Sequence, residues 1–436
     1  MLSFLRRVIP LPVFQVYHFF LARLSAFVYR YPSEELIVIG VTGTNGKTTA
    51  SYLIAKALEA TGEKVGCTTT ALLKIGDREW LNPTKMTMPG RFFLQRMLRQ
   101  MVDAGCRYVV IETSSQGLAQ SRHIGISYDV AVFTNLTPEH IEAHGGFEAY
   151  KAAKGILFQH VAARHAKYIG GKLVPTLAIL NADSEHAEFY AHAAKGAHVE
   201  WYSRTGARGL TPDEYHLEAK GTDLVVKGNY GRLQLPGAYN VENTLAALAT
   251  AEALGAPMGK ALAAICALSF VPGRYELVDQ GQPFRVIIDY AAEPAAMQQL
   301  YAALRLSPRA RLIHVLGSCG GGRDVARRPI LGELAGKEAD IVIVTNEDPY
   351  DDSPRAIIDQ VAAGARSAGK VEGETLFLVD DRAQAIERAI QLAQADDVVL
   401  LTGKGSELWM CVANGKKLPW SERAVAEAAL KRRASL

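Results

Sequence analysis

Residues 37–50 read IVIGVTGTNGKTTA, and this stretch decides the fold. Its apolar start predicts a short buried strand, a glycine-rich turn follows, and the residues after the turn predict a helix. A phosphate-binding loop requires that order of strand, turn and helix. Gly43 and Gly46 let backbone N–H groups face phosphate oxygens, whose negative charge the start of the helix favours. Lys47 can reach the β- and γ-phosphates, and Thr48 can ligate Mg²⁺.

The length and composition of the chain narrow its class. With 436 residues the chain is too long for one small core, so we expect two or three domains. A hydrophobic content of 49% and a charged content of 21% are typical of a soluble globular protein. The net charge of +3, without a long basic run, argues against nucleic-acid binding. Five scattered cysteines without a C-x-x-C pair indicate reduced thiols and argue against a zinc site.

The first 31 residues are apolar and aromatic, and their only charged residues are the arginines at positions 6, 7, 23 and 30. Pro10 and Pro12 make this segment a poor membrane-spanning helix, and a strand follows too soon for a signal peptide. Two interpretations stay open. The segment is a helix packed on the following domain, or it is a basic amphipathic helix resting on the inner face of the membrane.

The part of the chain that follows alternates predicted strands with helices as far as about residue 270, which indicates a parallel sheet with crossover helices. Three strands end in polar residues, at Glu112, Thr134 and Asn181, where open α/β sheets place their ligands. Short alternating runs between residues 201 and 235 predict a small antiparallel sheet.

A break in composition at residues 269–274 marks the end of this first unit, and strand–helix alternation then restarts in a Rossmann-like pattern. We therefore predict an α/β fold of three parts. Residues 1–36 form a short apolar helical segment, residues 37–271 a central P-loop domain with a parallel sheet, and residues 272–436 a Rossmann-like α/β domain.

Three residues outside the loop have side chains suited to phosphoryl chemistry. Glu112 ends a strand, as a metal-binding carboxylate of an ATPase does. His140 follows another strand end, and Lys154 lies in a predicted helix. Each also has a plain structural interpretation on its own: a helix cap, a solvated loop side chain and a surface charge.

Together, the motifs resemble those of the Mur ligase family, ATP-dependent ligases that form amide bonds, and its MurE-type members in particular. The similarity follows the chain in order from about residue 37 to residue 407. The motifs that carry it are GTNGKT at 43–48, ETSSQGL at 112–118, TNLTPEH at 134–140, YKAAKGILF at 150–158, NVEN at 240–243, GRYE at 273–276, DYA at 289–291, GRD at 322–324, EDPY at 347–350 and GKGSE at 403–407.

The resemblance implies that ATP phosphorylates a substrate carboxylate to an acyl phosphate, which an incoming amine attacks with release of phosphate. Positioning and charge neutralisation dominate such a reaction. The implied catalytic residues are Lys47, Glu112, His140 and Lys154. The implied ATP-binding residues are Gly43, Thr44, Asn45, Gly46, Lys47, Thr48, Thr49, Asn243, Arg274 and Asp289. Two Mg²⁺ ions are implied, held by Thr48, Glu112, His140 and Lys154, the last as a carbamate made with CO₂.

The resemblance also implies two small-molecule substrates, a nucleotide-sugar peptide of peptidoglycan synthesis and an amino acid, handled by a monomer in the cytoplasm. MurE-type ligases add the third residue to UDP-N-acetylmuramoyl-L-Ala-D-Glu. The residues expected at the donor peptide are Thr87, Ser114, Gln120 and Arg122. Those expected at the acceptor amino acid are Arg323, Glu347, Asp348, Tyr350, Gly403 and Glu407.

Departures from the family pattern leave the substrates open. Only residues 1–36 precede the core, where MurE-type ligases carry a uridine-binding domain, so a lipid-linked donor is an alternative. Tyr350 replaces the arginine of a D-N-P-R motif, and the acids Asp348 and Glu407 suit an amine. Lysine, ornithine and diaminopimelate therefore all stay possible as acceptors. Two further alternatives are a folylpolyglutamate-like or poly-amino-acid ligase, and a non-catalytic nucleotide-binding protein beside the membrane.

Overall fold

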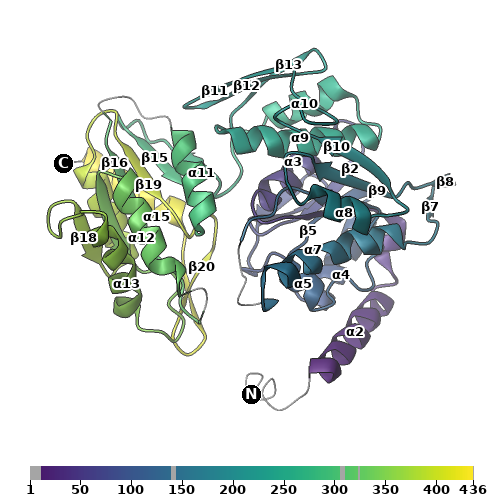
Figure 1. The fold of residues 1–436 in the computed structure, drawn as a ribbon, viewed down its shortest axis with the longest axis horizontal. Coiled ribbons are helices and arrows are strands. Elements are labelled where there is room, and N and C mark those ends of the chain that lie inside the picture. Colours follow the sequence, from purple (N-terminus) through teal and green to yellow (C-terminus); the bar gives the residue numbers. More distant parts are fainter. Residues whose placement is uncertain (1–10, 139–143, 305–309, 323–324, 436) are drawn as a thin grey trace.

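The computed structural model describes residues 11–138, 144–304, 310–322 and 325–435. His140 and Arg323 lie outside these residues. Figure 1 shows two lobes joined by the chain between α10 (Met258–Cys266) and β14 (Glu276–Val278). The predicted α/β fold class is confirmed, and we keep the predicted domain boundary between residues 271 and 272 as a proposal.

The first lobe is built on an eight-stranded sheet in the order β10-β9-β6-β1-β5-β2-β3-β4. Its strands are parallel except for the antiparallel β3 and β4. The strands are β1 (Ile37–Thr42), β2 (Lys64–Thr68), β3 (Leu72–Ile75), β4 (Arg78–Leu81), β5 (Cys106–Glu112), β6 (Val130–Phe133), β9 (Leu177–Asn181) and β10 (His198–Tyr202).

Strand β1 is buried on both faces, which its continuous apolar sequence requires. Ile37, Ile39 and Val41 point into one core, and Val38 points into the other. The helices of the first core are α3 (Lys47–Glu59), α9 (Ala238–Ala253) and α10; those of the second are α4 (Arg91–Asp103), α5 (Ser115–Ala119), α7 (Phe147–Ala162) and α8 (Ala187–Ala193). The lobe is therefore a three-layer sandwich with β1 at its centre.

Small elements complete the first lobe. The predicted antiparallel sheet is confirmed as β11 (Glu214–Glu218), β12 (Gly221–Val226) and β13 (Asn229–Leu233). A two-stranded ribbon, β7 (Tyr168–Ile169) and β8 (Lys172–Leu173), extends from one end, and the turn η1 (Pro32–Glu35) leads into β1.

The second lobe has a six-stranded sheet in the order β14-β15-β19-β16-β17-β18, parallel except for β14. Its strands after β14 are β15 (Arg285–Ile288), β16 (Leu312–Leu316), β17 (Ile341–Thr345), β18 (Leu376–Val379) and β19 (Val398–Leu401). Helices α11 (Pro294–Leu304), α12 (Arg327–Glu338) and α13 (Pro354–Ser367) cover one face, and α14 (Arg382–Leu392) and α15 (Glu422–Ala434) cover the other. A hairpin, β20 (Trp409–Val412) and β21 (Lys416–Pro419), follows the last parallel strand.

The apolar N-terminal segment contains helix α2 (Leu11–Val28), which packs on α4. Ala22, Ser25 and Ala26 of α2 are fully buried, and Arg99 of α4 donates to the carbonyl oxygen of Tyr29, just after the helix, 3.1 Å away. The prediction of a packed helix is therefore confirmed for one face of α2. Among the described residues, no helix combines the length and the apolar character that crossing a membrane needs.

Candidate active site

The two sheets direct their carboxyl ends to one cavity of about 660 Å³, lined by both lobes. In the first lobe, β6, β1 and β5 are neighbours, so the phosphate-binding loop, Glu112 and Thr134 lie along one sheet edge. In the second lobe, β15, β19, β16 and β17 are neighbours. The segments that follow these strands contribute Asp289, the 403–407 loop, Cys319 and the Glu347–Asp348 pair.

The phosphate-binding loop is held in place by its neighbours. Thr44 and Asn45 donate their backbone N–H groups to Asn135, both at 2.8 Å. Gly46, the residue just before α3, has φ +79°, and a Cβ there would lie 2.3 Å from Oδ1 of Asn243, so this position needs glycine. Lys47 bends back onto the loop, where its Nζ donates to the carbonyl oxygen of Thr44 at 2.5 Å. Thr49 also lines the cavity.

Thr48 and Glu112, expected to hold Mg²⁺, are adjacent in the structure. The hydroxyl of Thr48 donates to Oε2 of Glu112 at 2.9 Å, and the backbone N–H of Thr70 donates to the same oxygen at 2.6 Å. Glu112 is only 2% exposed. A hydroxyl and a carboxylate are the hard oxygen ligands that Mg²⁺ prefers, so this pair fits the ion.

Lys154 reaches the loop from α7. Its side chain is 1% exposed, and Nζ donates to the carbonyl oxygen of Gly43 at 2.6 Å and lies 4.3 Å from the ring centroid of Tyr150. The structure therefore brings Lys154 to the predicted phosphate site. No cluster of three or more His, Cys, Asp or Glu suited to a metal occurs among the described residues, which do not include His140.

The residues expected to bracket ATP come from both lobes. Arg274 lies just after the junction, and its Nη2 donates to the hydroxyl of Thr48 at 3.1 Å while its guanidinium covers the Tyr290 ring at 4.5 Å. Asp289 accepts the N–H groups of Tyr275 and Ala291, both at 2.7 Å. Burial raises the pKa of Asp289, and the charge of Arg274 opposes that shift.

The residues expected at the donor peptide lie at the first-lobe end of the cavity. Thr87, Ser114 and Arg122 line it, whereas Gln120 lies behind them and accepts from Nη2 of Arg122 at 2.7 Å. Ser114 also caps α5, because its hydroxyl accepts the N–H of Gly117 at 3.1 Å.

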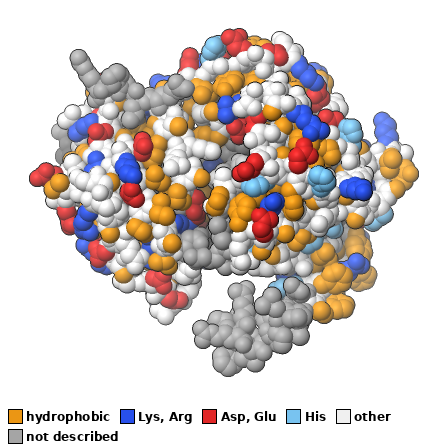
Figure 2. All heavy atoms as spheres, in the orientation of Figure 1, with side chains coloured by type: hydrophobic (Ala, Val, Ile, Leu, Met, Phe, Trp, Pro, Cys, Tyr) orange, Lys and Arg blue, Asp and Glu red, His pale blue; other side chains and the backbone are white. Residues whose placement is uncertain are grey.

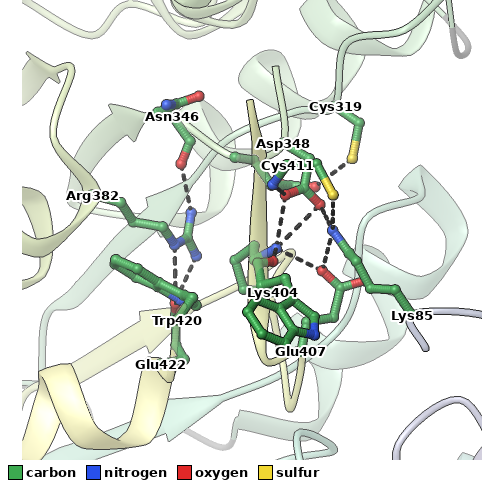
Figure 3. Close-up of polar contacts among 12 residues, drawn as sticks. Lys85, Cys319, Asn346, Asp348, Arg382, Lys404, Glu407, Cys411, Trp420 and Glu422 are labelled. Carbon is green, nitrogen blue, oxygen red and sulfur yellow. Dashed lines mark hydrogen bonds and ion pairs between the residues drawn. The ribbon is translucent and has the colours of Figure 1, made fainter. Parts of the chain in front are cut away.

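The expected acceptor residues form an acidic end in the second lobe (Figure 3). Glu347, Asp348, Gly403 and Glu407 line the cavity, and Tyr350 is not among the residues that line it. The thiol of Cys319 donates to Oε1 of Glu347 at 3.0 Å.

Two lysines that sequence reasoning did not assign pair with the acids at this end: Lys85, which lines the cavity, and Lys404, which is buried behind it. Lys404 donates to Oδ1 of Asp348 at 3.0 Å and to Oε2 of Glu407 at 2.6 Å. Lys85, from the first lobe, pairs with Asp348 and lies 2.8 Å from Oε2 of Glu407. Burial works to lower the pKa of Lys85, but the carboxylates of Glu407 and Asp348 outweigh it and raise that pKa above its ordinary value. Lys85 and Asp348 are 263 positions apart, and no local pattern links them.

Comparison with known proteins yields two family matches. The family model of the Mur ligase middle domain matches residues 41–251, and that of the Mur ligase glutamate ligase domain matches residues 273–405. The UDP-N-acetylmuramyl-tripeptide synthetase of Roseiflexus sp. (strain RS-1) is 40% identical over 417 residues, which cover 94% of this chain and 81% of that protein. The UDP-N-acetylmuramoyl-L-alanyl-D-glutamate–2,6-diaminopimelate ligase of Geobacillus kaustophilus (strain HTA426) is 36% identical over 417 residues, with coverages of 95% and 82%.

Solved structures show the same similarity. A UDP-N-acetylmuramoyl-L-alanyl-D-glutamate–2,6-diaminopimelate ligase superposes with a TM-score of 0.60 at 28% identity, covering 92% of this chain and 79% of that one. A folylpolyglutamate synthase from Mycobacterium tuberculosis superposes with a TM-score of 0.66 at 18% identity, with coverages of 87% and 90%. The second likeness shows the fold alone.

Proposed function

This chain belongs to the Mur ligase family, whose members are ATP-dependent, ADP-forming ligases, and from that membership we propose that it adds a diamino acid to a UDP-N-acetylmuramoyl dipeptide. The product would be a peptidoglycan precursor. The observation that carries the proposal is the shared cavity, in which the phosphate-binding loop of one lobe faces the Glu347–Asp348 pair and Glu407 of the other.

In the proposed reaction the phosphates of ATP lie against the 43–49 loop, with Lys47 turned from Thr44 onto the γ-phosphate. Thr48 and Glu112 would hold Mg²⁺, which neutralises phosphate charge when bound. Arg274 already reaches Thr48 from the second lobe, so it is placed to approach the same phosphates once ATP binds. Asn243 and Asp289 would complete the nucleotide site.

We further propose that Lys154 acts as a carbamate. Its amine would add to CO₂ with loss of one proton, which puts an anionic carboxylate beside the loop, where a second Mg²⁺ and His140 would meet it. The support is the position of Lys154, buried and 2.6 Å from the carbonyl oxygen of Gly43.

The two substrates would enter from opposite ends of the cavity. Thr87, Ser114 and Arg122, with Gln120 behind, would hold the donor peptide, whose carboxylate suits the guanidinium of Arg122. The acceptor amino acid would be surrounded by Glu347, Asp348, Gly403 and Glu407, together with Arg323. Tyr350 does not line the cavity, so it would affect the acceptor only through residues that do. Because one chain supplies both lobes of the cavity, we propose that a monomer is active. We place the reaction in the cytoplasm, where ATP is available.

The test is phosphate release from ATP with UDP-N-acetylmuramoyl-L-Ala-D-Glu as donor and L-lysine, L-ornithine or meso-diaminopimelate as acceptor. We expect release that depends on both substrates, together with a product enlarged by one amino acid. Phosphate release with folate or a lipid-linked precursor, and none with the nucleotide-linked donor, would favour a folylpolyglutamate-like ligase or a ligase for a lipid-linked donor instead. No release with any donor would leave a non-catalytic role.

We also propose a peripheral membrane contact through the N-terminal segment. Apolar side chains gather on the surface of α2 (Figure 2). Eight large apolar side chains of α2 and the turn after it are exposed, with Phe20 at 66% and Phe27 at 67%. They are Val16, Tyr17, Phe19, Phe20, Leu24, Phe27, Val28 and Tyr31. Residues 1–31 contain four arginines and no acid, which suits an anionic lipid surface.

A further inference from the structure

Two of the carboxylates at the acidic end of the cavity are already paired with lysines of the chain itself (Figure 3). Asp348 and Glu407 form a carboxylate pair, and each of them contacts both Lys85 and Lys404. Two carboxylates therefore face two ammonium groups, and their charges sum to zero. Asp348 also accepts the backbone N–H of Cys411 at 2.7 Å, and Glu407 accepts the hydroxyl of Tyr290 at 3.1 Å.

The two lysines differ in how firmly they are placed. Lys404 is fully buried, and besides the two acids it donates to the carbonyl oxygen of Trp409 at 2.8 Å. Lys85 belongs to the other lobe, on the segment after β4, and its side chain is 10% exposed at the cavity. Of the two, Lys85 is the one that can leave without breaking the interior of the second lobe.

An acceptor with a distal ammonium needs a carboxylate, because a charge left without a partner in such a cavity is costly. Among the described acids at this end, Glu347 accepts a hydrogen bond from the thiol of Cys319, a neutral donor, whereas the Asp348–Glu407 pair holds two lysines. A distal ammonium that binds at Asp348 and Glu407 would therefore meet a carboxylate pair whose charge is already balanced.

We propose that Lys85 is a specificity-determining residue that occupies, at Asp348 and Glu407, the position of the acceptor's distal ammonium. A diamino acid binds there only by displacing Lys85, whereas an amino acid with an apolar side chain of the same length leaves Lys85 in place. The inference rests on the proposed function, because it concerns the acceptor of that reaction. Lys85 thereby lowers the preference for diamino acids that the two carboxylates would otherwise confer.

The experiment compares L-lysine with L-norleucine, which has the same chain length and no distal amine. The values of kcat and KM for both are measured by phosphate release in the wild type, Lys85→Met, Lys85→Arg and Lys227→Met. Methionine keeps an unbranched apolar stem and removes the charge. Lys227 is the matched control, because it pairs with Glu252 on the surface of the first lobe, 2.5 Å away.

In Lys85→Met, we expect the ratio of kcat/KM for lysine to kcat/KM for norleucine to rise about tenfold to a hundredfold, mainly through the KM for lysine, as one regained charge-assisted contact predicts. Lys85→Arg and Lys227→Met should keep the wild-type ratio. An unchanged ratio in Lys85→Met overturns the proposal. A loss of activity with diaminopimelate alone also overturns it, since that would assign Lys85 to a substrate carboxylate.

Calorimetric titration of lysine and norleucine into the same variants separates this inference from the proposed function. Wild-type protein that releases no phosphate with any acceptor contradicts the proposed function. Lysine that then binds Lys85→Met more tightly than wild type still supports the competition, and equal binding refutes it. Lys85→Gln repeats the titration if Lys85→Met melts at a lower temperature than Lys227→Met.

Discussion

Lys154 and Lys151 are two lysines on the same helix with opposite surroundings. Lys154 is buried and contacts the loop, whereas Lys151 pairs with Glu148 at 3.5 Å and lies over the ring of Phe189 in α8, away from the loop. If Lys154 acts in catalysis, Lys154→Ala should lower the activity and Lys151→Ala should not, although both substitutions remove the same kind of side chain.

We predict that Lys154→Ala loses turnover by about a hundredfold to a thousandfold, as expected when a group that neutralises phosphoryl charge is removed. Added bicarbonate should not restore the activity, because the amine that reacts with CO₂ is gone. Phosphate release measures the effect, and ¹³C-bicarbonate labelling should give a carbamate signal that Lys154→Ala lacks. Lys151→Ala should behave as wild type. Full activity in Lys154→Ala would reject the carbamate role.

Single residues also mark how far sequence reasoning reached. It placed Lys47, Thr48 and Glu112 at one site because Glu112 ends one strand, Lys47 and Thr48 follow the loop after another, and parallel strands share that edge. It could not find Lys85, because an ion pair between lobes depends on how the lobes meet. It placed Tyr350 at the acceptor from its motif, yet that residue does not line the cavity.

Among the elements, strand β16 carries a titratable residue into the core of the second lobe. His314 is fully buried, 2.8 Å from the hydroxyl of Tyr301 on α11 and 2.9 Å from that of Thr402 after β19. Burial, helped by the charge of Arg382, lowers the pKa of His314 to about 3. The folded protein therefore keeps this imidazole neutral throughout the ordinary pH range.

We predict that His314 makes stability depend on pH. In the unfolded chain its pKa returns to about 6.5, so between about pH 6.5 and 3 the unfolded state binds more protons than the folded state. The contribution of His314 to the free energy of unfolding is favourable above pH 6.5. It is lost as the pH falls, and the free energy of unfolding decreases by up to about 1.4 kcal/mol per pH unit. The free energy of unfolding, measured with denaturant between pH 7 and pH 5, should fall less steeply with decreasing pH in His314→Asn than in the wild type.

The control for this prediction is His165→Asn, because the side chain of His165 is 78% exposed. That variant should keep the slope of the wild type. The same slope in His314→Asn as in wild type would show that another group governs the pH dependence.

The elements themselves were largely predictable from the sequence. β5 and β9 end at the predicted residues, Glu112 and Asn181, β6 ends at Phe133, one residue before the predicted end, and the strand and helix around the phosphate-binding loop appear as β1 and α3. Continuous apolar runs and a glycine turn are local signals, so they can be recognised in the sequence without knowledge of tertiary contacts. The order of the strands is not local: β1 lies between β6 and β5, and β19 between β15 and β16.

For the whole molecule, the outward face of α2 predicts how the protein distributes between solution and lipid. We expect the full chain to float with vesicles that contain anionic lipid and to stay behind with neutral ones, because apolar burial and arginine attraction act together. A double variant, Phe20→Ser with Phe27→Ser, should lose most of this binding, since both side chains are exposed.

The matched control replaces apolar residues exposed elsewhere, Tyr168→Ser with Leu173→Ser in the β7–β8 ribbon, and should float like wild type. Flotation in a density gradient measures all three proteins. If the α2 variant and the wild type float equally, or if neither floats, the proposed membrane contact of α2 is wrong and the helix only packs on the first lobe.

The charge balance at Asp348 and Glu407 has a consequence for how such proteins diversify. One of the two positive charges, that of Lys85, is encoded 263 codons upstream of Asp348 and still further upstream of Glu407. A single codon change at position 85 can therefore alter the net charge around an acceptor while every motif of the second lobe stays intact. A chimera that takes its second lobe from a relative keeps Lys85, so its cavity stays balanced only if the new lobe supplies both acids and the second lysine.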